Sequence, residues 1–591
     1  MLNFIDFEVF KYDWLCVIIN PVDNLKTICV NDTEKLRKYY EEHKDQIFVG
    51  QNIRGYDQYI FKGLLLGMNA KYINDQIINK ETPSYKINHN IYNVKAYKIS
   101  DAFYKINLNI YDVKPNRQTS LKAMECFMGE SIEETEVPFD IDRKLTEEEI
   151  ESTIKYCTCD VENTMKVFNI NVADFKSQIE LINTFKLPFK FVSKTKPQLT
   201  AQILKATPKI YNDEWNYSVP STAKIKKYTS VVEWFKNPKN KDYDKFLEIE
   251  IAGVPHTFAW GGLHGAIKKY NGCGYFINVD VGSYYPSLMI AYGFISRSVQ
   301  NAKLYEEIYH TRLKYKANKD PRQAPYKIVL NSTYGAMKDK FNALYDPLMA
   351  NNVCVSGQIL LLDLLERFEE NNIKIIQTNT DGVLVKLNAC NDEEAEIQRT
   401  KLKRICSDWE QRSKMNLEFD EFVKVIQADV NNYVIVDKSG HYKSKGACVK
   451  KLSTLDYDLP IINKALINKL VHNIPIEETI KKCDDLKEFQ KLVKITSNYH
   501  HALYDNKIYN NKFFRVFASK EPKGCIYKCK LNKNPEKVAN TPNNCFIYNK
   551  SVNGVKVPSE LDKVWYIEET KKRLERFLND DLNFLNDDLI L

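Results

Sequence analysis

Two aspartates, Asp280 and Asp381, lie at the ends of apolar segments that are predicted to be buried strands. Residues 275–281 are apolar and rich in strand-forming types, and Asp280 lies at the end of this run, just before a Gly-Ser turn. Residues 373–386 contain two apolar runs around Asn-Thr-Asp-Gly, a pattern that predicts a β-hairpin with Asp381 at its tip. A buried carboxylate needs a cation as its partner. If the two strands are neighbours, both aspartates can share divalent ions, which is the arrangement used for displacement at phosphorus.

A third segment lies between them in the chain. Lys327, Asn331 and Tyr334 follow helical spacing and share one face. In this order, the segments that start at Asp280, Lys327 and Asn379 resemble motifs A (DxxSLYPS), B (KxxxNSxYG) and C (YxDTDS) of family B DNA polymerases. The resemblance implies a templated DNA polymerase with two Mg²⁺, replaceable by Mn²⁺, at a metal site made of Asp280, Val281 and Asp381.

The same resemblance implies a site for the incoming nucleotide. Arg312 and Lys316 are four residues apart on a predicted helix, 303–317, and with Lys327 they would neutralise the triphosphate, although helical cations usually face solvent. Tyr285 would lie under the sugar and exclude a ribose. The other residues implied to contact the nucleotide or the nascent base pair are Ser283, Asn331, Tyr334 and Gly335. The short span from Asp280 to Lys327 favours extension of a nucleic-acid primer.

The N-terminal third carries a second set of acids. Asp6 and Glu8 are two apart on a predicted strand and so share a face, and Asn52 and Asp57 follow a second strand. A capping box at Thr146 predicts a helix to Phe168, which carries Tyr156 and Asp160. The three pairs are similar to the DxE, NxxxFD and YxxxD motifs of proofreading 3′–5′ exonucleases, with Tyr56 in place of Phe.

This second resemblance implies an RNase H-like fold with its own reaction. Asp6, Glu8, Asp57 and Asp160 would hold two further Mg²⁺, Tyr156 would orient the attacking water, and Asn52 would contact the strand being trimmed. Ser120-Leu121 resembles a further element that contacts single strands.

Three segments are candidates for DNA contacts. Gly261 and Gly262 resemble an element that touches the template, and a simple glycine-rich bend is the equal alternative. The predicted strands 423–436 and 442–446 resemble the primer-contacting segment of the family. The residues that carry this resemblance are Tyr433, Lys443, Lys445 and Gly446. Residues 506–556 hold eleven Lys or Arg against two Glu with aromatic residues between them, which predicts a DNA-gripping surface that includes Lys528 and Lys530, or else a solvated basic face.

These assignments predict a multi-domain α/β protein. The expected parts are an exonuclease (1–186), a linker and palm entry (187–270), a palm (271–295 and 335–451), fingers (296–334), and a thumb with a C-terminal tail (452–591). In the thumb, residues 460–471, 476–495 and 565–578 have helical patterns.

Composition indicates the class of protein and the compartment in which it would work. The 591-residue chain is 44% hydrophobic, carries a net charge of +8, and has no run of about eighteen apolar residues, so no membrane span is expected. Its fourteen cysteines lack paired zinc-ligand spacing, which favours reduced thiols in a cytoplasm. The expected partners are primer–template DNA and dNTPs, with the protein a monomer, and its small size suggests a phage or mobile element in a bacterial host. An acidic repeat, 577–582 and 584–589, could dock on a processivity factor or be a frayed helix end.

Two other functions fit the same residues. Asn379 stands where motif C usually has the first of two aspartates, so the chain could be a 3′–5′ exonuclease with an impaired polymerase site. A DNA-binding scaffold with both sites inactive is disfavoured because every exonuclease acid is present. We expect Asn379 to be a working variant, because an amide oxygen can still accept a hydrogen bond or hold a metal-bound water.

Overall fold

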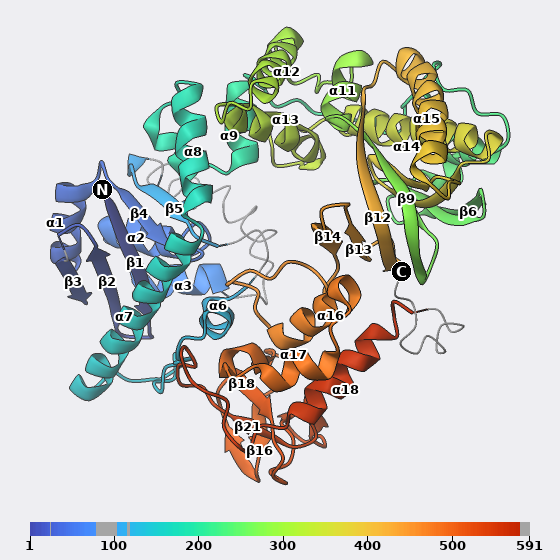
Figure 1. Ribbon diagram of the computed structural model, residues 1–591. Coiled ribbons are helices and arrows are strands. Elements are labelled where there is room, and N and C mark those ends of the chain that lie inside the picture. The colour runs from blue at the N-terminus through green and yellow to red at the C-terminus, as the bar shows by residue number, and fades with distance from the viewer. Residues whose placement is uncertain (24, 79–102, 104, 115–118, 579–591) are drawn as a thin grey trace. The chain divides into compact units, whose positions relative to one another are not determined.

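The chain folds into two compact units, each made from several stretches of sequence (Figure 1). This computed structural model describes residues 1–23, 25–78, 103, 105–114 and 119–578. The first unit contains Met1–Thr195, Leu452–Leu459 and Asp484–Asp562, and the second contains Lys196–Lys451, Pro460–Cys483 and the chain from Lys563. The acidic repeat that begins at Phe577 lies almost wholly outside the described residues.

A five-stranded sheet is the centre of the first unit. Its strands, in spatial order, are β3 (Leu25–Val30), β2 (Trp14–Asn20), β1 (Leu2–Val9), β4 (Ile47–Gly50) and β5 (Asn109–Asp112). The β1 strand pairs antiparallel with β2 and parallel with β4. Its apolar residues enter the core of the unit, so the two acids of β1 are held at the centre of the sheet.

Helices surround this sheet, and α7 packs along β1 and β2 (Figure 1). Thr146 and Glu149 form the predicted capping box at its N-terminus, with the Glu149 carboxylate accepting from the Thr146 amide at 2.9 Å. The prediction of this helix is confirmed, with its end at Ile170. The helices are α1 (Thr33–His43), α2 (Asp57–Leu65), α3 (Ala70–Ile78), α6 (Leu121–Met128), α7 (Glu147–Ile170) and α8 (Val172–Thr184), followed by the 3₁₀ helix η2 (Phe189–Ser193).

The C-terminal part of the first unit contains two small sheets. One has the order β15 (Lys491–Lys494), β18 (Phe513–Ala518), β21 (Cys545–Ile547), and the other β17 (Lys507–Tyr509), β16 (His501–Tyr504), β19 (Tyr527–Cys529), β20 (Glu536–Lys537). The predicted helix over 476–495 is wrong beyond Lys482. Cys483 is extended (ψ 125°), and the Asp485 carboxylate accepts from the Lys487 amide at 3.0 Å, which starts the 3₁₀ helix η4 (Leu486–Phe489) instead.

A nine-stranded sheet is the centre of the second unit. Its spatial order is β14 (Tyr442–Lys445), β13 (Asn432–Val436), β12 (Leu417–Asp429), β9 (Tyr270–Val281), β11 (Gly382–Lys386), β10 (Lys374–Asn379), β8 (His264–Ala266), β7 (Val254–Ala259) and β6 (Phe246–Ile251). The predicted strand 275–281 and hairpin 373–386 are therefore confirmed.

The prediction of one strand over 423–436 is wrong, because a tight turn divides it into β12 and β13. The Asp429 carboxylate accepts from the Asn431 amide at 2.7 Å and from the Asn432 side chain at 3.0 Å. An aspartate that bonds to the backbone two residues on stabilises such a turn. The sharp return pairs β13 with β12, so that β13 and β14 form one edge of the sheet.

Helices complete the second unit. They are α9 (Lys196–Ile203), α10 (Thr229–Lys236), α11 (Tyr284–Ala291), α12 (Ala302–Ala317), α13 (Gln323–Lys338), α14 (Pro347–Glu370), α15 (Asp392–Ser413), α16 (Pro460–His472), α17 (Ile476–Lys482) and α18 (Lys563–Leu574), with the short 3₁₀ helix η3 (Pro238–Asn240). Among the described residues, α14 alone has the length and apolar composition to cross a membrane, and 94% of that apolar window is buried inside the structure. A core helix shows the same burial, because its apolar residues cover its whole circumference.

Candidate active sites

Asp280 and Asp381 lie next to each other at one end of the central strands of the second unit. Asp280 is near the end of β9, and Asp381 occupies the turn between β10 and β11, where its carbonyl oxygen accepts from the Val281 amide at 2.8 Å. The register pairs Asp280 with Gly382, and a Cβ at Gly382 would lie 2.6 Å from the Asp280 carboxylate. A larger residue at position 382 would displace the Asp280 carboxylate. We call these two acids the carboxylate pair.

The electrostatics of the carboxylate pair suit a cation. Burial raises the pKa of Asp280 to about 7, and the nearby charges of Asp381 and Glu418 add to that shift. Desolvation also raises the pKa of Asp381, while the ammonium group of Lys445 opposes the shift. Carboxylate oxygens are the ligands that Mg²⁺ prefers. A divalent ion beside both acids would remove their repulsion, so the donor set fits the expected Mg²⁺.

The turn that carries Asp381 is held by close packing. Thr380 adopts a left-handed conformation (φ +62°), and its amide donates to the Leu263 carbonyl at 2.8 Å. A Cβ at Gly262 would lie 2.7 Å from the Thr380 hydroxyl, so Gly262 permits this approach, whereas Gly261 has nothing within 4 Å of a Cβ. The Asn379 amide donates weakly to the Val430 carbonyl at 3.4 Å. Gly262 therefore packs against the acid-bearing turn.

A cavity of about 490 Å³ opens beside the carboxylate pair, and we call it the cation-lined cavity. Arg312, Lys316 and Lys327 all line it. The Arg312 guanidinium is buried and donates to the Ser283 hydroxyl at 2.5 Å, while its Nε has no acceptor in the described part of the chain. Lys316 forms an ion pair with Glu418 at 2.6 Å. Helices α12 and α13 thus aim three cations at the space in front of two acids.

Two aromatic rings form another part of this region. Tyr285 lines the cation-lined cavity and packs on Tyr334 with ring centroids 4.3 Å apart. Asn331 lines the cavity as well. Gly335 is exposed on α13, and a Cβ there would meet nothing within 4 Å. Of the predicted residues of α13, Lys327 and Asn331 therefore line the cavity, Tyr334 contacts it through Tyr285, and Gly335 is not among the lining residues.

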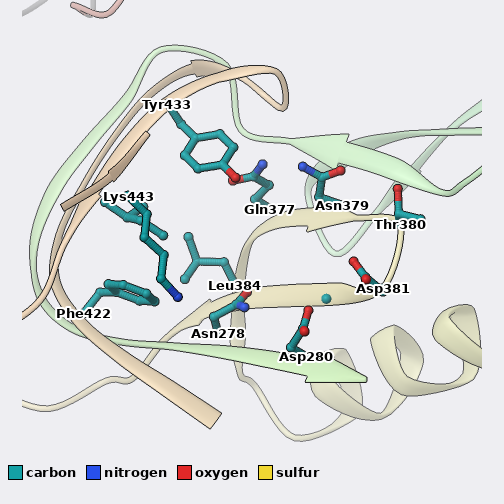
Figure 2. Close-up of a pocket in the computed structure, with 12 residues that line it drawn as sticks. Asn278, Asp280, Gln377, Asn379, Thr380, Asp381, Leu384, Phe422, Tyr433 and Lys443 are labelled. Atoms are coloured by element: carbon teal, nitrogen blue, oxygen red, sulfur yellow. The ribbon is translucent and has the colours of Figure 1, made fainter. Parts of the chain in front are cut away.

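A second pocket, of about 230 Å³, is also lined by the carboxylate pair (Figure 2). Tyr433 and Lys443 line it, and the Lys443 ammonium bonds to Asp420 at 2.7 Å and lies over the Phe422 ring at 5.3 Å. Gly446 has φ +114°, where a side chain would collide with Asn432. The pocket is lined by amides and a lysine, with Leu384 and Phe422 among its apolar residues.

Several residues of these two spaces were not foreseen from the sequence. Glu418 holds Lys316 in the cation-lined cavity, and Asn278 and Gln377 line the second pocket. The sequence signal for Glu418 is its spacing from Asp420, two residues on, which places both acids on one face of β12. In the structure Glu418 pairs in register with Asp280. Amides inside apolar strands give no comparable signal.

In the first unit the predicted acids come together as well. Asp6 and Glu8 lie on β1, Asp57 is the first residue of α2, and Asp160 lies on α7. Burial raises the pKa of all four, to about 7 at Asp57, and the charges of Asp57 and Glu8 raise that of Asp6 further. The pKa of Tyr156 is raised by burial and by the charge of Asp160. We call these four carboxylates the acid cluster.

A lysine that the sequence did not single out also enters the acid cluster. The Lys122 ammonium, on α6, forms ion pairs with Asp160 at 2.5 Å and with the buried Glu125 at 3.2 Å. It lies 4.5 Å from the centre of the Tyr156 ring. Ser120, the predicted strand-contacting residue, precedes α6 and has a buried hydroxyl with no partner in the described residues. Asn52 has φ +63° and accepts from Lys114 at 3.1 Å.

The basic segment 506–556 is only partly a surface. Arg515 is fully buried and donates to the carbonyl oxygens of Lys550 at 2.6 Å and Glu130 at 2.7 Å, so it joins β18 to the end of α6. Lys528 and Lys530 lie over the Tyr499 ring at 4.4 and 4.9 Å. These two lysines remain partly accessible for a phosphate, whereas Arg515 serves the interior.

Comparison with known proteins adds a partial similarity. No family model matches the chain. Three curated proteins, each called DNA polymerase 1, align with parts of it. The protein from Saccharolobus solfataricus is 25% identical over 34% of this chain and 21% of its own length. The protein from Sulfolobus acidocaldarius is 24% identical over 26% of this chain and 17% of its own length, and the one from Aeropyrum pernix is 24% identical over 38% of this chain and 21% of its own length. The aligned part thus spans about a fifth of these relatives. The family B DNA polymerase structure from Pyrobaculum calidifontis is 13% identical with a TM-score of 0.40, over 99% of this chain and 78% of that one.

Proposed function

We propose that this chain is a template-directed DNA polymerase of family B that extends a primer 3′-hydroxyl with dNTPs. The observation that carries the proposal is the carboxylate pair beside the cation-lined cavity, where Arg312, Lys316 and Lys327 face the same space. Phosphoryl transfer needs acids to hold metal ions and cations to neutralise a triphosphate. The polymerase names of the partially aligned relatives support the same reaction.

In this reaction each group of the cavity has a part. Asp280, Asp381 and the backbone of Val281 would hold Mg²⁺, which when bound activates the 3′-hydroxyl and neutralises the phosphates. Arg312 is positioned by Ser283, and its unpaired Nε is available for a phosphate oxygen. Lys316 would exchange its partner Glu418 for the triphosphate. Tyr285, braced by Tyr334, would lie under the sugar and exclude a ribose.

The second pocket would receive the primer end. It opens beside the carboxylate pair and is lined by Tyr433 and Lys443, so a primer strand there would present its 3′-end to Asp280 and Asp381. The ammonium groups of Lys443 and Lys445 would contact its phosphates. Asn331 would line the nascent base pair, and the exposed Gly335 would let a base approach α13 closely.

We further propose that the acid cluster is a 3′–5′ exonuclease with an RNase H-like fold. The mixed sheet around β1 and the convergence of Asp6, Glu8, Asp57 and Asp160 support this assignment. The buried Oδ1 of Asp57 has no partner in the described residues, as expected for a group that completes a metal site. Tyr156 would orient water, and Asn52 would contact the strand being trimmed.

We assign the proposed palm to the nine-stranded sheet and the proposed fingers to α12 and α13. Three strands of that sheet, β6, β7 and β8, come from the span 187–270 that the sequence assigned to a linker and palm entry. The predicted thumb and tail, 452–591, is shared between the two units: Leu452–Leu459 and Asp484–Asp562 fold with the proposed exonuclease. A basic surface that grips DNA with Lys528 and Lys530 would therefore belong to the same compact unit as the trimming site.

One gel tests both activities. A 5′-labelled primer on a longer template is incubated with the protein and Mg²⁺, with and without dNTPs. We expect extension with dNTPs and shortening from the 3′-end without them. Shortening under both conditions would favour the second candidate, an exonuclease with an impaired polymerase site, for which the amide of Asn379 in place of an acid is the specific observation. No change under either condition would refute both proposals.

A further inference from the structure

A thiol lies inside the acid cluster of the first unit. Ligand atoms of Cys157, Asp6 and Glu8 all lie within 4.8 Å of one another. Cys157 is fully buried on α7, and its sulfur contacts the backbone oxygen of Asp6 at 3.6 Å. Its helix packs along β1, which holds the thiol beside the two acids of that strand. The three residues therefore offer one sulfur and two oxygen ligands to a common point.

The two acids nearest to Cys157 form no ion pair in the described residues. Asp160 is paired with Lys122 at 2.5 Å, whereas neither Asp6 nor Glu8 forms an ion pair within the part of the chain that the structure describes. Asp57 is 2% exposed, its charge is the largest charge effect on Asp6, and its Oδ1 accepts no hydrogen bond among the described residues. A buried carboxylate without a partner is costly, so this side of the cluster is arranged for a cation.

We propose that Asp6, Glu8 and Cys157 bind one thiophilic divalent cation, of which Zn²⁺ is the type. Zinc takes thiolate sulfur at about 2.3 Å and carboxylate oxygen at about 2.0–2.2 Å in a tetrahedral arrangement. Ligand atoms around such an ion are roughly 3.5 Å apart, so side-chain rotations of about 1 Å would close the present spread. The thiol proton is released to the solvent on binding. Asp57 is not part of this set of three, and a water molecule can complete the four-coordinate arrangement.

Sulfur decides which metal this set prefers. Mg²⁺ is a hard ion that selects oxygen ligands, whereas soft thiolates select zinc and its heavier analogue cadmium. A zinc ion held by Cys157 would occupy the carboxylates of Asp6 and Glu8 and so compete with Mg²⁺ there. Inhibition of trimming by zinc rests on the proposed exonuclease activity, but the binding itself does not.

The test measures binding without any DNA reaction. The full-length protein, with Cys273 and Cys390 replaced by serine to remove the two exposed thiols, is titrated with Cd²⁺ while the sulfur-to-cadmium absorption is recorded. We expect one tight equivalent that Cys157→Ala weakens at least tenfold. The matched control is Cys159→Ala, two residues away on the same helix, which should leave that equivalent unchanged.

A second variant tests the same site without changing position 157, where a substitution could also impair folding. Asp6→Asn keeps the thiol and the shape of the acid but removes a charged ligand, so it should weaken the same equivalent by a similar factor. Equal titrations of the parent and Cys157→Ala, with absorption from other thiols only, would overturn the proposal. Tight binding in a protein that does not trim DNA would instead refute the exonuclease and leave this site intact.

Discussion

Replacing Asp280 by asparagine should stabilise the metal-free protein at high pH. Burial and the charge of Asp381 raise the pKa of Asp280 to about 7, well above the ordinary value of an aspartate. Because the folded state favours the protonated acid, its charge destabilises the fold above about pH 7. That penalty fades as the pH falls from about 7 towards the unfolded value of about 3.9.

The size of this effect follows from the pKa shift. About three pKa units at 1.36 kcal/mol each give an upper limit of about 4 kcal/mol. The carboxylate borders an open cavity, so solvent screening reduces the expected gain of Asp280→Asn to about 1–2 kcal/mol. Asn is nearly isosteric with Asp, so it leaves the close contact with Gly382 in place.

The assay is thermal unfolding in EDTA at about pH 8.5 and about pH 5.5, followed by the fluorescence of tryptophans such as Trp409, which is buried in the same unit. We expect Asp280→Asn to raise the midpoint at the higher pH, and the gain to shrink at the lower pH. Added Mg²⁺ should stabilise the parent more than the variant. The matched control is Asp244→Asn, an exposed position of the second unit, which should change little. Equal midpoints of parent and Asp280→Asn at both values would refute the reasoning.

Four further variants test the proposed chemistry. Asp280→Ala should stop nucleotide addition and spare trimming, while Asp6→Ala with Glu8→Ala should do the reverse; loss of both activities from either change in folded protein would contradict separate sites. Tyr285→Val should raise ribonucleotide incorporation far more than it lowers dNTP addition, and unchanged discrimination would place the sugar gate elsewhere. Asn379→Asp should change the extension rate by less than about tenfold, about 1.4 kcal/mol, because the site already has two acids; restored activity in an otherwise inactive parent would show that the polymerase site had decayed.

The sequence was sufficient to locate both sets of acids. Asp280 and Asp381 are predictable because each ends an apolar run, and such runs become adjacent strands of one sheet. Helical spacing likewise predicted that Arg312 and Lys316 share a face, and both line the cation-lined cavity. The capping box at Thr146 predicted the start of the helix that carries Asp160. Local patterns of this kind determine where a strand or helix begins and which face a residue occupies.

Contacts between distant segments could not be predicted in this way. Lys122 reaches Asp160 across thirty-eight residues, and Glu418 reaches Lys316 across one hundred and two. No spacing rule links such pairs, because tertiary packing brings them together. The Asp429 turn was missed because apolar residues continue on both sides of it. The prediction of a helix to Ile495 was wrong because helical spacing of apolar residues, Leu486 and Phe489 among them, does not require a helix. In the structure these residues are buried from a 3₁₀ helix, and a strand follows it.

Templated incorporation of a single nucleotide tests the central claim most directly. The parent protein is mixed with Mg²⁺, one dNTP at a time, and a primer whose next template base is varied, with Asp381→Asn as the inactive counterpart. The proposal predicts that only the complementary dNTP is added in each case, and that Asp381→Asn adds none, because it removes one of the two acids that face the cation-lined cavity. Addition that ignores the template, or equal addition by Asp381→Asn, would contradict a two-carboxylate polymerase site.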